Sequence, residues 1–144
     1  MTYNYSNAQF RSILCGLGYL ARDYVSDGYS SEFPVTYDNS SLDGYHTKEA
    51  IKAFQQHYDC QDIDGILGPE TTGKANTEIN VIHQELNIVI SAGLPFNLPL
   101  YGPQTVAAVK QFQALINVPQ NGIASDSVLL ALRNRAYNGA ALSR

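Results

Sequence analysis

Tryptophan is absent from this 144-residue chain, and cysteine occurs only twice. With so few cysteines, the chain is not a small domain held together by disulfides. No apolar run approaches the roughly 18 residues that a membrane-spanning helix needs, so we expect no membrane partner. The first residues lack the basic and apolar regions of a secretory signal. We therefore expect synthesis in the cytoplasm and leave the final location open.

Basic residues are scarce as well, with nine Lys and Arg against thirteen Asp and Glu and a formal charge of −4. The imbalance lies in residues 1–72, which carry ten acids and four bases, whereas residues 73–144 carry three acids and five bases. Proteins that bind nucleic acid usually offer a basic surface that displaces counterions from the phosphates. The composition therefore argues against a nucleic-acid partner.

The residue types that hold metals or form nucleophiles are too sparse for a site. Cys15 and Cys60 allow one disulfide, but the apolar surroundings of Cys15 favour two buried thiols. His57 and Cys60 have the spacing of one half of a zinc site, with no second pair. Residues 62–65 are similar to part of a calcium loop, but Cys60 and Thr71 would fill its first and last positions. We expect no metal, no cofactor and no catalytic residue.

An internal repeat is the strongest pattern in the chain. Residues 44–55 align with residues 102–113 at an offset of 58, and six of the twelve positions are identical. After a shift of one residue, Asp64-Gly65-Ile66 also matches Asn121-Gly122-Ile123. Asp-Gly and Asn-Gly are strong turn dipeptides, and their glycines are expected to have positive φ. Each copy therefore contains a helix, a short loop and a turn, followed by another helix.

Both copies begin with a Gly-x-x-Thr element that is typical of a helix start. We expect Thr47 and Thr105 to be the N-caps, since a threonine hydroxyl can accept a hydrogen bond from a free N–H in the first turn. Phe54 and Phe112 are expected in the core. Apolar residues recur at helical spacing in both segments: Ala50, Ile51, Phe54 and Tyr58 in the first, and Ala108, Val109, Phe112, Leu115 and Ile116 in the second.

The N-terminal region predicts one helix and one long connection. The apolar spacing within residues 10–17 predicts a helix, capped by Ser6 or Asn7. Residues 23–44 are rich in Asp, Ser, Tyr and Gly and are too long for an ordinary connection, so they form an insertion, an ordered loop or a mobile segment. Within them, Val35–Tyr37 fit a short extended piece.

Two further helices are expected in the second part of the chain. Pro69 suits the first position of a helix, where its missing N–H costs nothing. Apolar residues recur every three or four positions from there to about Ala92, which favours one continuous helix over two shorter ones. The last helix is expected to be capped by Ser125 and to end at residues 138–139, an Asn-Gly pair.

The repeat resembles a known family. Its first copy, continued by residues 64–71, is similar to the small helical peptidoglycan-binding domain, and Leu17-Gly18-Tyr19 matches the opening element of that pattern. The resemblance covers residues 8–76. It continues over residues 78–133 in a degenerate form, where residues 123–126 replace the second Gly and Thr of the pattern.

The resemblance implies an all-α protein with two tandem three-helix modules, residues 1–76 and 77–144. The modules are either separate or share a long central helix, and the 23–44 loop is an insertion in the first. The implied function is non-catalytic binding of bacterial cell-wall peptidoglycan, through its glycan strand or its stem peptide. Two alternatives stay open: a structural or adaptor subunit of a phage or phage-like particle, with a protein partner, and a small cell-wall hydrolase.

A ligand made of sugars and peptides needs aromatic faces and planar hydrogen-bonding groups. We expect these in the loops before each Gly-x-x-Thr element and at the Asp-Gly and Asn-Gly turns. The candidate ligand-binding residues are Asp43, Tyr45, His46, Asp62, Asp64, Tyr101, Gln104, Gln120 and Asn121. Tyr24, Tyr29 and Tyr37 cluster in the long loop, either as a binding surface or as local packing.

Overall fold

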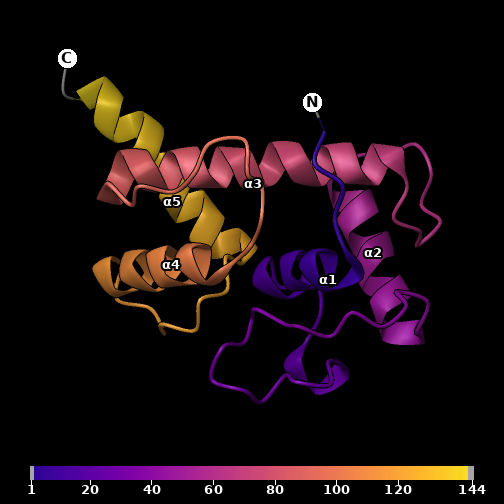
Figure 1. Ribbon diagram of the computed structural model, residues 1–144. Helices are drawn as coiled ribbons and strands as arrows, with labels where there is room; N and C mark the ends of the chain where they lie inside the picture. The colour runs from indigo at the N-terminus through magenta and orange to yellow at the C-terminus, as the bar shows by residue number, and fades with distance from the viewer. Residues whose placement is uncertain (1, 143–144) are drawn as a thin grey trace.

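The computed structural model describes residues 2–142, and the side chains as far as Asn138 (Figure 1). Over this range the chain forms helices and no strand, which confirms the predicted all-α class. No helix in the range is both long and apolar enough to cross a bilayer. The elements are α1 (Asn7–Gly16), the 3₁₀ turn η1 (Arg22–Tyr24), α2 (Tyr45–His57), α3 (Pro69–Ile90), α4 (Pro103–Leu115) and α5 (Asp126–Leu142).

The 22-residue helix α3 is the central element. It packs against both α4 and α5, while α1 packs against α2. In Figure 1, α3 runs across the top of the molecule, with α1 and α4 beneath it. One contiguous core joins all five helices, and it includes Phe10, Phe54, Ile82, Phe112 and Leu132. Phe54 and Phe112 are fully buried, as their repeated positions predicted.

The prediction of one continuous central helix is confirmed. Gly68 is the N-cap of α3 and Pro69 stands in its first turn. Apolar side chains at helical spacing, such as Ala75 and Ile79, are fully buried. The helix ends at Ile90, two residues before the expected point, because Ser91 adopts the left-handed conformation with φ of 53°.

The predicted helix boundaries need three corrections. Ser6 caps α1 through a reciprocal pair of hydrogen bonds with Gln9, as expected. Thr47 and Thr105, however, are not N-caps: the caps of α2 and α4 are the glycines three residues before them, and both threonines are buried in the first turn. The last helix, α5, also continues through residues 138–139 to Leu142. A glycine lowers helix propensity by about 1 kcal/mol relative to alanine and does not by itself stop a helix.

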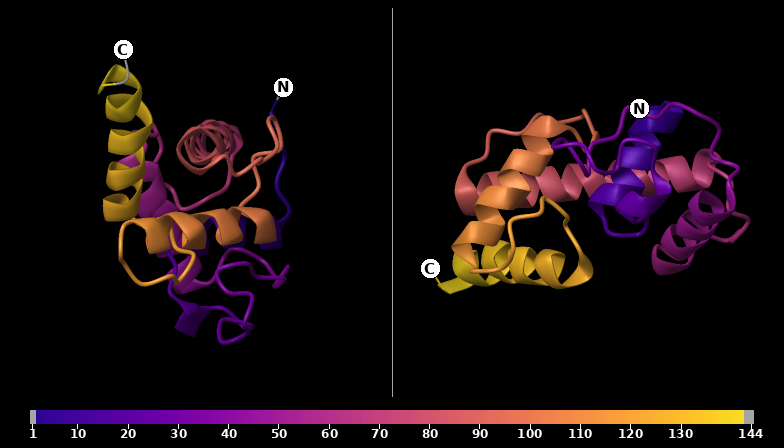
Figure 2. Two further views of the ribbon diagram at one scale, coloured as in Figure 1. Left: turned by 90° about the vertical axis from the view of Figure 1, so that its left-hand side faces the viewer. Right: turned by 90° about the horizontal axis from the view of Figure 1, so that it is seen from below.

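The 23–44 loop is ordered and fastened to α1. The buried guanidinium of Arg11 donates hydrogen bonds to three loop carbonyl oxygens, those of Asp38, Ser40 and Ser41. The hydroxyl of Ser12 accepts from the N–H of Thr36 at 3.0 Å and donates to its carbonyl oxygen at 3.2 Å. Figure 2 shows this loop on the side of α1 that faces away from α3. The predicted extended piece at 35–37 lies in this loop, outside any strand.

Candidate functional site

The Asp-Gly turn of the first half (residues 1–76) is built around one buried glutamine. The side-chain amide Nε2 of Gln55 donates to Asp64 Oδ1 at 2.9 Å and to the carbonyl oxygen of Ile66 at 3.1 Å. Its Oε1 accepts from the N–H of Gly65 at 2.9 Å. Gly65 has φ of 73°, a conformation that a residue with a side chain rarely adopts. The glutamine thus fixes the turn from inside.

The Asn-Gly turn of the second half (residues 77–144) has the same construction. Gln113 Nε2 donates to Asn121 Oδ1 at 2.8 Å and to the carbonyl oxygen of Ile123 at 3.0 Å. Its Oε1 accepts from the N–H of Gly122 at 2.9 Å, and Gly122 has φ of 75°. The repeat seen in the sequence therefore corresponds to a repeat of hydrogen bonds in space.

Asp64 and Asn121, two of the predicted ligand-binding residues, serve these turns. Each uses its Oδ1 to accept from the buried glutamine and from the backbone N–H two residues further on. The hydrogen bond from Gln55 is the main reason why the pKa of Asp64 is lowered, and the N–H of Ile66 adds to the effect. Both side chains thus have a structural role, although both residues are exposed.

Tyr101 is a correction to the predicted site, because it is buried rather than exposed. Only 2% of the residue is accessible, and its hydroxyl donates to the carbonyl oxygen of Gly122 at 2.6 Å. Its ring lies against Gly16, where an added Cβ would come within 2.5 Å of the ring carbons. The carbonyl oxygen of Gly16 also accepts from the N–H of Ala124 at 2.7 Å. Tyr101 therefore joins the end of α1 to the second half.

A groove of about 490 Å³ lies beside two of the predicted residues, Tyr45 and His46. It lies where the end of α1, the η1 turn and the first turns of α2 meet, and one side chain of the second half reaches it. We call it the first-half groove. Its lining is formed by Cys15, Gly18, Tyr19, Leu20, Ala21, Arg22, Tyr24, Phe33, His46, Glu49, Ala50 and Ile123.

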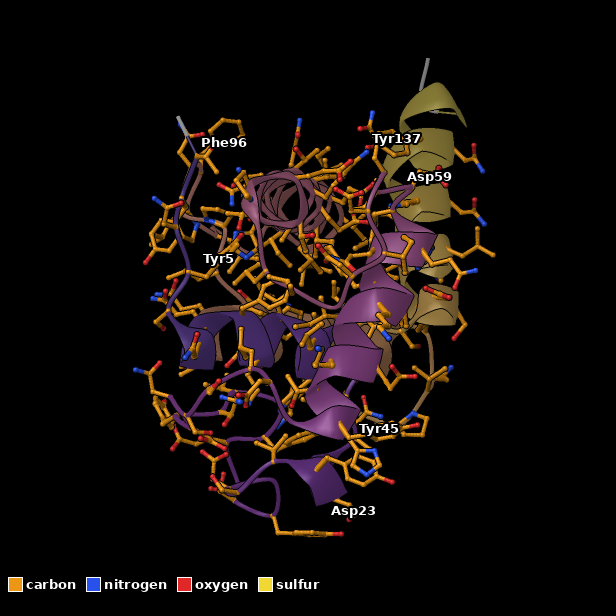
Figure 3. The ribbon with its side chains drawn as sticks, turned by 90° about the vertical axis from the view of Figure 1, so that its right-hand side faces the viewer. Tyr5, Asp23, Tyr45, Asp59, Phe96 and Tyr137 are labelled. Atoms are coloured by element: carbon orange, nitrogen blue, oxygen red, sulfur yellow. The ribbon has the colours of Figure 1, made fainter. Side chains whose placement is uncertain are left out.

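Aromatic rings form the rim of this groove. Tyr24 stacks on His46, with ring centroids 3.6 Å apart and planes 14° from parallel. Tyr45 meets His46 edge to face at 5.2 Å. Tyr24 is 50% exposed and Tyr45 is 73% exposed, so their rings are available to a ligand. Figure 3 shows Tyr45 at the end of α2 that faces the loop bearing Asp23.

The charged groups of the groove are few and balanced. The guanidinium of Arg22 lies 4.9 Å from the ring centroid of Phe33 and 5.4 Å from that of Tyr29, both cation–π contacts. Among the described residues of the lining, Arg22 is the one permanent cation and Glu49 the one carboxylate. Burial raises the pKa of the Cys15 thiol to about 12, so this thiol is protonated at neutral pH.

The predicted residues do not gather at one place. His46 lines the first-half groove, and Tyr45 touches it through His46. Asp43 lines a separate cavity of about 300 Å³ with Lys48 and Gly65. The remaining predicted residues are exposed on turns or at the start of α4 and line no part of the groove: Asp62, Gln104 and Gln120.

Sequence reasoning missed two charged residues of the groove, Arg22 and Glu49. The sequence predicts Glu49 to lie on an ordinary solvent-exposed face of a helix. Arg22 reaches the groove only because η1 folds back over α2. Of the tyrosines that cluster in the loop, Tyr24 lines the groove, while Tyr37 belongs to another cavity beside Tyr101. The clustering of tyrosines in the sequence pointed to this loop, but it could not distinguish Tyr24, which lines the groove, from Tyr37, which does not.

The long loop of the first half also reaches the start of α4 in the second half. Loop residues Ser31, Glu32 and Val35 lie against the start of α4, around a small cavity of about 180 Å³ with Pro103 and Lys110. The neighbouring loop residue, Pro34, comes within 3.4 Å of where a Cβ on Gly122 would lie. The long loop thus contacts both halves.

Comparison with known families gives one match. Residues 14–74 match the family described as "Putative peptidoglycan binding domain", so a domain of this family is found in the first half. Eleven of the twelve residues that line the first-half groove lie in this range, the exception being Ile123. The match ends before the second copy of the repeat. Comparison with curated proteins and with solved structures gives no match.

Proposed function

We propose that this protein binds bacterial peptidoglycan without cleaving it, and that the first-half groove is the binding site. One observation carries the proposal: an open groove with an exposed aromatic rim lies almost entirely within the residues that match the peptidoglycan-binding family. Binding sites of this kind are concave, mostly apolar, and carry a few polar groups that orient the ligand. We propose the cell wall as the place where the protein acts.

The chemistry of the groove supports binding over hydrolysis. Most glycoside hydrolases use a pair of carboxylates that flank the scissile bond. The described lining contributes one carboxylate, Glu49. A thiol nucleophile needs a lowered pKa, whereas burial raises the pKa of Cys15. We therefore assign no catalytic role to these groups.

We also propose that the second half is a degenerate second copy of the same module, with a structural role. The support is the pair of matching turns around Gln55 and Gln113. At the start of α4, Pro103 and Gln104 stand at the positions of Tyr45 and His46, so the second half lacks these two aromatic side chains. We therefore expect one peptidoglycan site per chain.

Co-sedimentation of the purified protein with insoluble sacculi tests the proposal. We expect saturable binding that a rise in salt changes little, because the groove carries almost no net charge. The double variant Tyr24→Ala with His46→Ala should weaken binding by about tenfold or more, since aromatic stacking is worth roughly 1–3 kcal/mol. Gln104→Ala changes the position equivalent to His46 in the second half and should have no effect.

The same samples test the non-catalytic part of the proposal. Incubation with sacculi should release neither reducing sugars nor free amines. Release of either would contradict binding without cleavage. If the protein does not sediment with sacculi at tens of micromolar, the proposed function is wrong, and the particle subunit with a protein partner becomes the better hypothesis.

A further inference from the structure

Resting on the proposed function, we infer that the first-half groove takes the N-acetylated amino sugars of the glycan strand and not the stem peptide. The two parts of peptidoglycan differ in charge and shape. The sugars are neutral rings with acetamido groups, and the stem peptides are flexible chains that carry carboxylates. The groove and its surroundings discriminate between them in three respects.

The first respect is charge. Arg22 and Glu49 balance each other in the described lining, so the groove suits a neutral ligand. Residues 1–72, which include eleven of the twelve lining residues, carry ten acids and four bases. Asp23 also lies beside Arg22 and accepts a hydrogen bond from the hydroxyl of Tyr29. An anionic peptide would meet net repulsion there, and a neutral sugar would not.

The second respect is the aromatic rim. Tyr24 and His46 lie nearly parallel and form one flat stack at the mouth of the groove. A pyranose ring has a flat face of C–H groups that can lie on such a surface. A peptide in extended form is usually held by backbone hydrogen bonds to a strand edge, and the described residues contain no strand. The rim therefore fits a sugar ring better than a peptide backbone.

The third respect is the interior of the groove. Its deeper lining is apolar and buried, with Cys15, Leu20, Phe33 and Ala50 each less than 9% exposed. The methyl end of an acetamido group can be buried against such a surface. The N–H groups of Arg22 remain able to donate to the acetamido carbonyl oxygen or to hydroxyl oxygens, because the cation–π contacts use only the flat face of the guanidinium.

Competition against sacculus binding tests this inference with three soluble probes: a hexamer of N-acetylglucosamine, a glucose hexamer without acetamido groups, and a synthetic stem peptide. We expect the N-acetylglucosamine hexamer to displace the full-length protein from sacculi. The glucose hexamer should be at least about tenfold weaker, because it lacks the acetamido group. The stem peptide should not compete.

Two tyrosine variants supply the matched control. Tyr24→Ala should weaken binding of the N-acetylglucosamine hexamer about tenfold, in the range expected for one lost stacking contact. Tyr37→Ala should leave it unchanged, because this tyrosine belongs to the same loop and is 60% exposed but does not line the groove. Equal unfolding midpoints of the two variants would show that the fold is kept in both.

The failures of the inference and of the proposed function are distinguishable. If the protein binds sacculi and only the stem peptide competes, the groove takes the peptide, and the inference is wrong while the proposed function stands. If the protein binds sacculi and the two hexamers compete equally, the assignment of the acetamido group is wrong. If the protein does not bind sacculi at all, the proposed function itself fails.

Discussion

The two halves of the molecule share a turn but differ in the side chains at the start of the helix beside it. In the first half, the start of α2 is open to solvent, with Tyr45 and Glu49 exposed next to the groove. In the second half, the positions of Tyr45 and His46 are taken by Pro103 and Gln104, which are also exposed but are not aromatic. A local sequence pattern thus builds the same turn twice, whereas the aromatic rim of the groove also needs Tyr24, a residue of the long loop that stacks on His46.

The largest expected effect concerns the contact that joins the halves. Tyr101→Ala should lower the free energy of unfolding by about 3–5 kcal/mol, because it removes a fully buried aromatic ring and leaves a cavity against Gly16. Tyr45→Ala, at an exposed tyrosine, should change it by less than about 0.5 kcal/mol. Urea unfolding at neutral pH measures both. Equal effects would mean that the halves are not held together at Tyr101.

The variant Tyr101→Phe keeps the ring, so the contact can still be tested if Tyr101→Ala does not fold. It removes only the hydrogen bond to the carbonyl oxygen of Gly122, which is buried. We expect a loss of about 1 kcal/mol. A loss as large as that of the alanine variant would contradict the view that packing, rather than this hydrogen bond, carries the contact.

The next effect compares the two buried glutamines. Gln55→Ala and Gln113→Ala each leave a buried glycine N–H without its acceptor, which costs about 1–3 kcal/mol. Gln55 should be the costlier of the two, because its amide also donates to the buried hydroxyl of Thr71 at 3.0 Å. The residue at the matching place in the second half is Val128, which needs no partner. Urea unfolding of both variants measures the order, and the reverse order would show that the turns are not equivalent.

Much of this comparison could be predicted from the sequence, because helix periodicity and turn chemistry are local. The continuous α3, the buried Phe54 and Phe112, and the positive φ of the turn glycines were all predictable. Burial of Tyr101 was not, since it depends on Gly16, which is 85 residues away in the chain. A tyrosine before a Gly-x-x-Thr element looks the same whether it faces solvent or a neighbouring helix.

The groove was predictable only in part for the same reason. His46 was found because it belongs to the repeat, and the tyrosine cluster pointed to the loop. The path of the loop, however, depends on Arg11, whose guanidinium binds carbonyl oxygens of residues 38–41. Every residue has a backbone carbonyl oxygen, so the sequence does not show which of them Arg11 binds. The position of Arg22 and Tyr24 over α2 could therefore not be predicted from the local sequence.

A smaller effect concerns the polar contact between α3 and α5. Glu85 is almost fully buried, and burial raises its pKa, although Arg133 opposes the shift. A carboxyl whose pKa is raised by folding stabilises the fold when protonated, and this contribution is lost as the pH rises through the folded pKa. Glu85→Gln should therefore gain stability relative to the parent chain between pH 4 and pH 7. Urea midpoints across this range measure the gain, and a relative loss would contradict the direction of the shift.

The smallest expected effect comes from exchanging the side chains of Asp64 and Asn121, because the first turn has an acid where the second has an amide. The pKa of Asp64 is lowered by the amide of Gln55 and the N–H of Ile66, so its contribution to stability is present near neutral pH and lost as the pH falls through the folded pKa. Asp64→Asn should remove this acid sensitivity, and Asn121→Asp should introduce it in the second half. Urea midpoints at pH 7 and pH 3 compare the variants with the parent chain. Because both side chains serve their turns and neither lines the groove, neither exchange should alter sacculus binding at neutral pH. A loss of binding in Asp64→Asn alone would instead show that the first turn, unlike the second, contacts the ligand.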